Sequence, residues 1–142
     1  MNLVDSSGWV EYLTDGENAN FFEAPILNSE NLLTPTICMY EVFKRILADF
    51  DHERALEAMG PMSLGQMVEL DRQLAMNAAQ ISTELKLAMA DSIILATARA
   101  RAAVLWTQDA HFKDIASVKY IEKRGGTAMP QRGRSRGQET GR

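Results

Sequence analysis

Two aspartates, Asp91 and Asp109, lie eighteen positions apart in a stretch whose pattern folds the chain back on itself. The pattern predicts a helix that opens at Asp91, a break near Ala102 and Ala103, and a short apolar strand over Val104–Trp106. The helix and the extended residues after it each span roughly 18 to 20 Å, so a tight reversal brings Asp109 beside Asp91. Asp91 shares its helical face with apolar residues, which turns its carboxylate inward. An inward carboxylate needs a cation, a metal ion or several N–H donors as a partner.

Two more acids occupy comparable places in the chain. Asp5 ends a short apolar strand expected over residues 2–5, and Glu41 lies early in a helix expected over residues 36–50. Short apolar strands alternate with helices along the sequence, which is typical of an α/β fold with a mainly parallel sheet. Sites in such sheets lie outside the carboxyl ends of the strands. We therefore expect all four acids to meet at that edge.

Four neighbouring carboxylates can remain ionised together only around cations. Their hard oxygen atoms suit Mg²⁺ or Mn²⁺. Such an ion activates water and stabilises the transition state of phosphodiester hydrolysis. Thr107, two residues before Asp109, and either Ser6 or Ser7 could add hydroxyl contacts to a ligand. The residue types thus indicate metal-assisted chemistry on a phosphate ester.

Each acid also has an ordinary structural interpretation. Asp5 and Asp91 could cap the helices that begin beside them, and Asp109 could form a turn. Glu41 lies opposite the apolar stripe of its helix, where a solvated side chain is the simpler interpretation. These interpretations do not predict that all four acids converge on one edge of the sheet. Convergence would therefore favour a functional site over four separate structural roles.

The remaining elements follow from apolar periodicity and from helix signals. Ser6 or Ser7 is expected to cap the first helix, Pro35 suits the first turn of a later one, and Gly60-Pro61 should stop the helix that begins at His52. The other expected helices cover residues 17–27 and 71–86, and the other expected strands cover residues 32–34, 66–70 and 118–121. The helix over residues 36–50 has an apolar stripe of Met39, Phe43, Ile46, Leu47 and Phe50, whose bulk suggests a surface for self-association.

Charge divides the chain into two parts. The chain carries a net charge of −4. The Gly- and Arg-rich residues 125–142 have a net charge of +3, so residues 1–124 have a net charge of −7. We expect one domain over residues 1–124 and a disordered tail over residues 125–142. An acidic body does not attract polyanions by its overall charge. A nucleic-acid substrate would therefore require local neutralisation, for which a divalent ion is suited.

Cysteine, histidine and hydropathy set further bounds. The single cysteine, Cys38, excludes an internal disulfide framework and fits a reducing compartment. His52 and His111 form no zinc-like spacing with Cys38 or with each other, so both are expected to be surface residues. Neither a signal peptide nor an apolar run of membrane-spanning length is found, and we expect a cytoplasmic protein.

Four segments of the sequence resemble the PIN-domain family and, within it, the VapC-type toxin ribonucleases. They are Val4–Val10, Tyr40–Val42, Ala90–Ala98 and Leu105–Phe112, in the order and spacing of the family. The resemblance covers about residues 2–122, and the last two segments are its more specific parts.

The resemblance implies a PIN-like three-layer sandwich with about five mainly parallel strands between helices. It implies a single-stranded RNA endonuclease with an acidic Mg²⁺ or Mn²⁺ site, in which Asp5, Glu41, Asp91 and Asp109 are catalytic. Asp5, Asp91 and Asp109 would hold the metal, with Ser6 and Thr107 as supporting hydroxyls. It also implies a homodimer inhibited by a cognate antitoxin, from which a basic side chain reaches the acids.

Two other functions compete with the nuclease. A phosphoacceptor signalling domain also gathers carboxylates at the edge of a parallel sheet, but it needs paired acids after the first strand, where Asp5 is followed by serines. A catalytically silent PIN-like module that binds RNA or protein is the second alternative. A metal-dependent assay on RNA separates the enzyme from both.

Overall fold

A five-stranded parallel sheet forms the centre of the computed structural model, which describes residues 1–124. The strand order is β3-β2-β1-β4-β5. The strands are β1 Asn2–Val4, β2 Leu32–Pro35, β3 Gln66–Val68, β4 Val104–Thr107 and β5 Val118–Tyr120. The α-helices are α1 Ser6–Leu13, α2 Ala19–Leu27, α3 Thr36–Asp49, α4 His52–Met62, α5 Arg72–Leu85 and α6 Met89–Ala100. The α/β class and the five parallel strands predicted from the sequence are confirmed.

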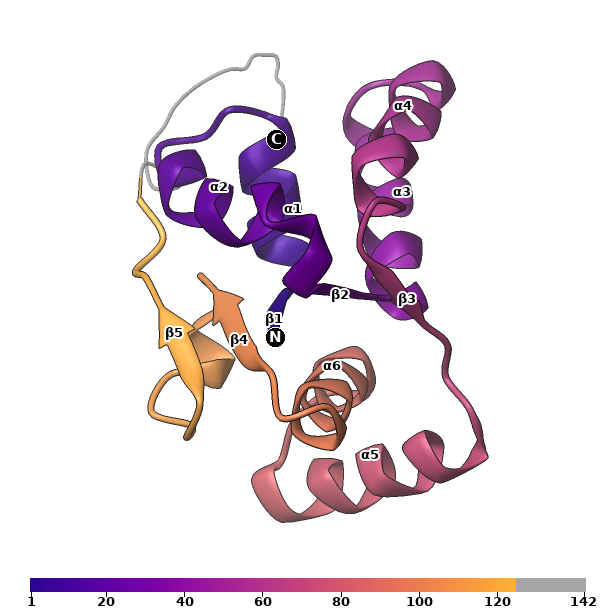
Figure 1. Ribbon diagram of the computed structural model, residues 1–142, viewed down its shortest axis with the longest axis vertical. Coiled ribbons are helices and arrows are strands. Elements are labelled where there is room, and N and C mark those ends of the chain that lie inside the picture. Colours follow the sequence, from indigo (N-terminus) through magenta and orange to yellow (C-terminus); the bar gives the residue numbers. More distant parts are fainter. Residues whose placement is uncertain (125–142) are drawn as a thin grey trace.

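Helices cover both faces of the sheet. Figure 1 shows α1 and α2 on one side of the strands and α5 and α6 on the other, with α3 and α4 packed together beside α1. The central strand β1 pairs Leu3 with Leu33 of β2 and with Leu105 of β4, and all three leucines are fully buried. Because β1 is covered on both faces, its consecutive residues Leu3 and Val4 are both fully buried, as in other buried parallel strands.

The ends of the central strands bring two acids to the same edge of the sheet. The register pairs Val4 with Trp106, so Asp5 leaves β1 beside Thr107, the last residue of β4. The backbone N–H of Asp5 still donates to the Trp106 carbonyl at 3.1 Å. Asp109 follows two residues after Thr107. The sheet itself therefore positions Asp5 and Asp109, as the sequence pattern predicted.

Helix starts agree with the sequence in part. Asp71 caps α5 as expected, because its Oδ1 accepts the N–H of Leu74 at 2.9 Å. The cap of α1 is Asp5 and not a serine, since Asp5 Oδ1 accepts the N–H of Gly8 at 2.9 Å. The helix α6 begins two residues before Asp91, with Ala88 at its N-cap position. The capping interpretation of Asp91 is therefore wrong, and that of Asp5 is right.

Two boundaries near prolines differ from expectation. Pro35 ends β2 in an extended conformation and is not part of the first turn of α3. The helix α4 continues through Pro61 to Met62 because Pro61 falls in the last turn, where the N–H of Ser63 closes the helix on the Met59 carbonyl at 3.0 Å. Met62 is fully buried, and this burial favours the extra turn. The break predicted near Ala102 and Ala103 is confirmed, with Ala102 at φ 50°.

The helix α3 packs on two sides, which the single predicted stripe did not anticipate. Its buried residues are Cys38, Val42 and Ile46, and Phe43 turns toward α4, where its ring lies 5.9 Å from that of His52. Leu47 and Phe50 are 42% and 48% exposed. Ile46, Met39 and Phe43 of the stripe pack in or against the core, and its outer end, Leu47 and Phe50, is an exposed apolar surface.

No helix within residues 1–124 is both long and apolar enough to cross a membrane. The tail expected over residues 125–142 lies outside the described residues. The domain boundary at residue 124 remains a prediction.

Candidate functional site

Asp5 is held at the carboxyl edge of β1 by three hydrogen bonds. Its side chain is almost fully buried, with the residue 3% exposed. Oδ1 accepts the N–H of Gly8 at 2.9 Å and the hydroxyl of Ser7 at 2.8 Å. Oδ2 accepts the hydroxyl of Thr107 at 2.6 Å. Because each carboxylate oxygen has two lone pairs, one acceptor position on Oδ2 is left for a further ligand.

These hydrogen bonds do not offset the burial of Asp5. Loss of solvent raises its pKa to about 7 from an ordinary 3.8, while the bonds from Thr107, Gly8 and Ser7 act in the opposite direction. The negative charge of Asp109 raises the pKa further. A carboxyl group of this kind is ionised readily only when a positive charge lies beside it.

Glu41 reaches the site from α3 and is held by a serine of α1. The hydroxyl of Ser6 donates to Glu41 Oε1 at 2.5 Å. Both serines contact an acid, since Ser6 contacts Glu41 and Ser7 contacts Asp5. Glu41 is half-buried, so its interpretation as a solvated residue is wrong.

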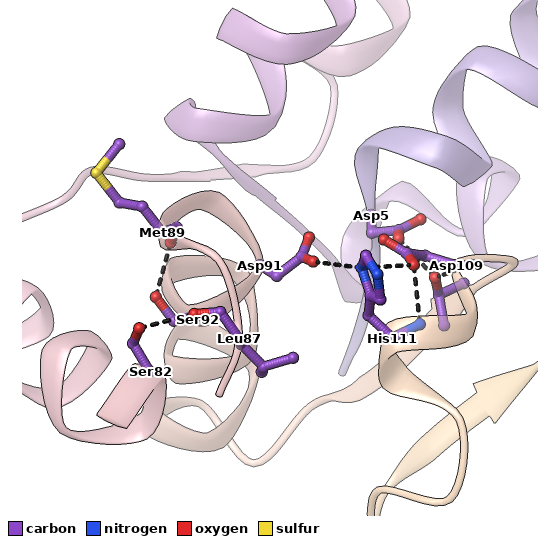
Figure 2. Close-up of polar contacts among 9 residues, drawn as sticks. Asp5, Ser82, Leu87, Met89, Asp91, Ser92, Asp109 and His111 are labelled. Carbon is purple, nitrogen blue, oxygen red and sulfur yellow. Dashed lines mark hydrogen bonds and ion pairs between the residues drawn. The ribbon is translucent and has the colours of Figure 1, made fainter. Parts of the chain in front are cut away.

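Asp91 and Asp109 meet around a histidine. Figure 2 shows His111 between the two acids, with its Nδ1 3.2 Å from Asp91 Oδ2 and 3.2 Å from Asp109 Oδ1. Burial raises the pKa of Asp91, the charge of Asp109 adds to the rise, and the contact with His111 lowers it. The predicted proximity of Asp91 and Asp109 is confirmed.

His111 is the site residue that the sequence reasoning missed. Its side chain is 71% exposed, as expected for a surface histidine, yet it lies against two of the four acids. A zinc-like spacing with His52 and Cys38 could not identify His111, because His52 lies on α4 and Cys38 lies in the buried face of α3, beside Asp5, Ser6 and Glu41. The available signal was the Asp109-x-His111 spacing in the turn after a strand, where a short turn folds the second side chain over the first.

The acids line one cleft of about 690 Å³. Its charged lining residues comprise six carboxylates and three basic side chains, a formal excess of three negative charges. The carboxylates are Asp5, Glu11, Glu17, Glu41, Asp91 and Asp109, and the basic residues are Arg45, Lys123 and Arg124. The structure thus brings together every acid that the sequence nominated, and adds basic groups at the same cleft.

A buried polar network supports the wall of the cleft beside Asp109. Gln108 donates through Nε2 to Glu11 Oε1 at 3.2 Å and accepts from Asn18 Nδ2 at 2.9 Å. Asn18 Nδ2 also donates to the Glu122 carbonyl at 3.1 Å. This last bond fixes the segment after β5 that carries Lys123 to the cleft. Neutral amides in loops carry no recognisable spacing, so these residues could not be predicted from the sequence.

The donor set fits a hard divalent cation. Asp91, Asp109 and His111 each offer an atom within 4.8 Å of the others. Asp5, which was also predicted as a metal ligand, is not in this group, but it lines the same cleft and keeps one acceptor position on Oδ2. A set dominated by carboxylate oxygens matches Mg²⁺ or Mn²⁺. Asp5 is also buried without enough compensation, which is the electrostatic condition that a cation relieves.

The fold and the site together define a parallel α/β domain with an acidic cleft at the carboxyl edge of its sheet. The family model of the PIN domain matches residues 3–118. The chain therefore belongs to the PIN domain family, and the PIN-like architecture predicted from the sequence is confirmed. Membership of this family argues against a phosphoacceptor signalling domain. None of the curated proteins matches the sequence significantly.

Several solved structures share the fold, among them VapC toxins. A chain of a toxin–antitoxin complex from Klebsiella pneumoniae has a TM-score of 0.70 at 21% identity, over 84% of this chain and 96% of that one. VapC20 of Mycobacterium tuberculosis, a sarcin–ricin loop cleaving toxin, has a TM-score of 0.69 at 13% identity, over 82% and 95%. A chain of DNA-bound VapBC from Salmonella typhimurium has a TM-score of 0.68 at 21% identity, over 86% and 98%.

Proposed function

We propose that this PIN domain is a metal-dependent endoribonuclease that cuts single-stranded RNA and serves as the toxin of a toxin–antitoxin pair. The observation that carries the proposal is the convergence of Asp5, Glu41, Asp91 and Asp109, from four separate parts of the chain, on one cleft. The structural neighbours include a toxin and chains of toxin–antitoxin complexes, and this supports the biological role.

The roles of the acids follow from their contacts. Asp5, Asp91 and Asp109 would hold Mg²⁺ or Mn²⁺, and the ion, when bound, supplies positive charge to the phosphoryl transition state and acidifies water. Glu41 has its Oε1 fixed by the Ser6 hydroxyl, which suits it to orient and deprotonate an attacking water molecule. Thr107 and Ser7 hold the Asp5 carboxylate in place.

The basic residues of the cleft suit an RNA backbone. Arg45, Lys123 and Arg124 line the same cleft as the acids. Phosphates on either side of the cut bond can pair with these side chains, which offsets the repulsion between an acidic protein and a polyanion. The preference for single strands rests on the family resemblance.

A cleavage assay tests the enzymatic proposal. The full chain is incubated with a single-stranded RNA of mixed sequence, the matching RNA duplex and the corresponding single-stranded DNA, each with Mg²⁺, with Mn²⁺ or with EDTA. We expect internal cuts in the single-stranded RNA, only with a divalent ion. An inactive protein under every condition would favour the silent binding module, and equal cutting in EDTA would refute metal dependence.

The proposed partner is an antitoxin that supplies a basic side chain to the acids. Arginine is favoured because its planar fork bridges two carboxylates at once. Beside the acidic cleft, a second groove of about 420 Å³ between α1, α3 and α4 is lined in part by Leu13, Ile46, Phe50 and Ala58, and it offers apolar contact to the same partner. Salt should weaken the charged contact while the apolar contact persists.

Co-expression tests the partnership. The chain is expressed with the small reading frame that lies next to its own gene, and the complex is purified in low and high salt. We expect a stable complex that does not cut RNA, from cells in which the chain alone is toxic. A chain that is harmless alone and captures no neighbouring product would indicate a nuclease without an antitoxin.

We also propose a cytoplasmic homodimer. The single buried Cys38 suits a reducing compartment. The exposed apolar end of α3, with Leu47 and Phe50, suits contact with a second copy of the chain.

A further inference from the structure

We propose that His111 is a nitrogen ligand of the cation and gives the site a preference for Mn²⁺ over Mg²⁺. The inference rests on the proposed metal-dependent function and adds to it a residue outside the four acids. Its starting point is the position of the imidazole in Figure 2, between Asp91 and Asp109.

The distances around His111 match those between neighbouring ligands of one ion. Nδ1 lies 3.2 Å from Asp91 Oδ2 and 3.2 Å from Asp109 Oδ1. Two donors on adjacent corners of an octahedron are about 3 Å apart when each is about 2.1 Å from the ion. Both nitrogen–oxygen distances are close to this spacing, and the two oxygens lie within 4.8 Å of each other, so one ion could contact all three atoms.

The backbone around His111 presents the ring to this position. The short 3-10 helix Ala110–Phe112 begins with Asp109 as its cap, and the N–H of His111 donates to Asp109 Oδ1 at 2.9 Å. Phe112 is fully buried and anchors the turn in the core. The backbone of His111 is thus held on both sides by its neighbours, and the ring lies against Asp91 and Asp109.

The chemistry of the donor decides the metal preference. Mg²⁺ takes oxygen ligands and gives up its water reluctantly. Imidazole nitrogen binds first-row transition ions better than it binds Mg²⁺. Three carboxylates would serve both ions, whereas a nitrogen among the donors favours Mn²⁺.

A hydrogen-bonding role for His111 makes a different prediction. If the imidazole only bridges Asp91 and Asp109 as a donor, it competes with any cation for the two carboxylates. Its removal would then strengthen the binding of Mg²⁺ and Mn²⁺ alike. If His111 is a ligand, its removal weakens Mn²⁺ binding and leaves Mg²⁺ binding nearly unchanged.

The test measures binding and does not depend on activity. Mn²⁺ is titrated into the metal-free full chain and followed by electron paramagnetic resonance, with pulsed measurements to detect coupling to an imidazole nitrogen, and Mg²⁺ affinity is measured by competition. The variants are His111→Ala and His111→Gln. His52→Gln is the matched control, because His52 lies on α4 and does not line the acidic cleft.

We expect nitrogen coupling in the parent and in His52→Gln, and none in either His111 variant. Mn²⁺ affinity should fall by about tenfold or more on removal of the ligand, and Mg²⁺ affinity by less than about twofold. Mn²⁺ bound by the parent without nitrogen coupling would overturn the role of His111 and leave the proposed nuclease intact. A parent chain that binds neither ion would overturn the inference together with the proposed metal dependence.

Discussion

The substitution Asp5→Asn should stabilise the metal-free protein, and more strongly as the pH rises. The change removes a buried charge at nearly constant volume. The amide oxygen of asparagine can still accept from Gly8 and Ser7, the two donors that Asp5 Oδ1 now serves. The Thr107 hydroxyl, which donates to Asp5 Oδ2, can turn to accept the amide N–H instead.

The magnitude follows from the shift in pKa. Burial raises the pKa of Asp5 in the folded protein to about 7 from an ordinary 3.8. Because the folded state holds this proton more tightly than the unfolded state, the stabilisation that the proton provides is complete below pH 3.8 and is lost as the pH rises through 7. A shift of about three units corresponds to roughly 4 kcal/mol, of which about 3 kcal/mol is lost between pH 4.5 and pH 8. An asparagine side chain at this position cannot titrate, so the variant escapes this loss.

Denaturant unfolding in EDTA at pH 4.5 and pH 8 measures the effect. The free energy of unfolding of Asp5→Asn should gain about 3 kcal/mol relative to the parent between the two pH values. Asp114→Asn is the matched control, because Asp114 is exposed and does not line the cleft. A difference between variant and parent that stays the same at both pH values would refute the buried-charge argument.

Three further predictions concern packing, the hydrogen bonds of the site and assembly. Gly8→Ala should lower stability by about 1–3 kcal/mol in a thermal melt, since the added Cβ would lie 2.5 Å from Phe22 Cε1. Thr107→Val should lower the free energy of unfolding by about 1–3 kcal/mol, because Thr107 donates to Asp5 and accepts from the Asp109 N–H at 2.8 Å. Unchanged stability would count against both hydrogen bonds. Light scattering should give twice the mass of one chain, and Phe50→Ser should shift it to the monomer; a parent that is monomeric at micromolar concentration contradicts self-association.

Much of the fold could be predicted from local signals. Apolar strands alternate with helices, and Asp71 marks the start of α5 as an N-cap should. The errors occurred where tertiary packing overrode a local rule. Pro61 is a helix breaker in sequence, but the burial of Met62 extends α4 past it. The predicted stripe of α3 omitted the buried residues Cys38 and Val42, because the helix has a second apolar side on which Phe43 packs against α4.

The site was predictable only as far as strand ends reveal it. Asp5 and Asp109 follow strands, so the parallel register alone places them at one edge. Glu41 lies on a helix face whose contact with Ser6 becomes visible only when α1 and α3 pack together. His111 is exposed and lacks a metal-binding spacing, so only the turn that folds it against Asp91 and Asp109 identifies it.

The four acids are proposed to act together on one phosphodiester. The most direct test compares the rate at which Asp91→Asn and Asp114→Asn cut single-stranded RNA in Mn²⁺, with circular dichroism to show that both are folded. Loss of a residue that only hydrogen-bonds to a metal ligand lowers metal affinity or activity by up to about 100-fold. Loss of a metal ligand itself should lower the cleavage rate at least as much. We therefore expect Asp91→Asn to be about 100-fold slower than the parent and Asp114→Asn to match the parent. Equal rates for the two variants would contradict the assignment of the site.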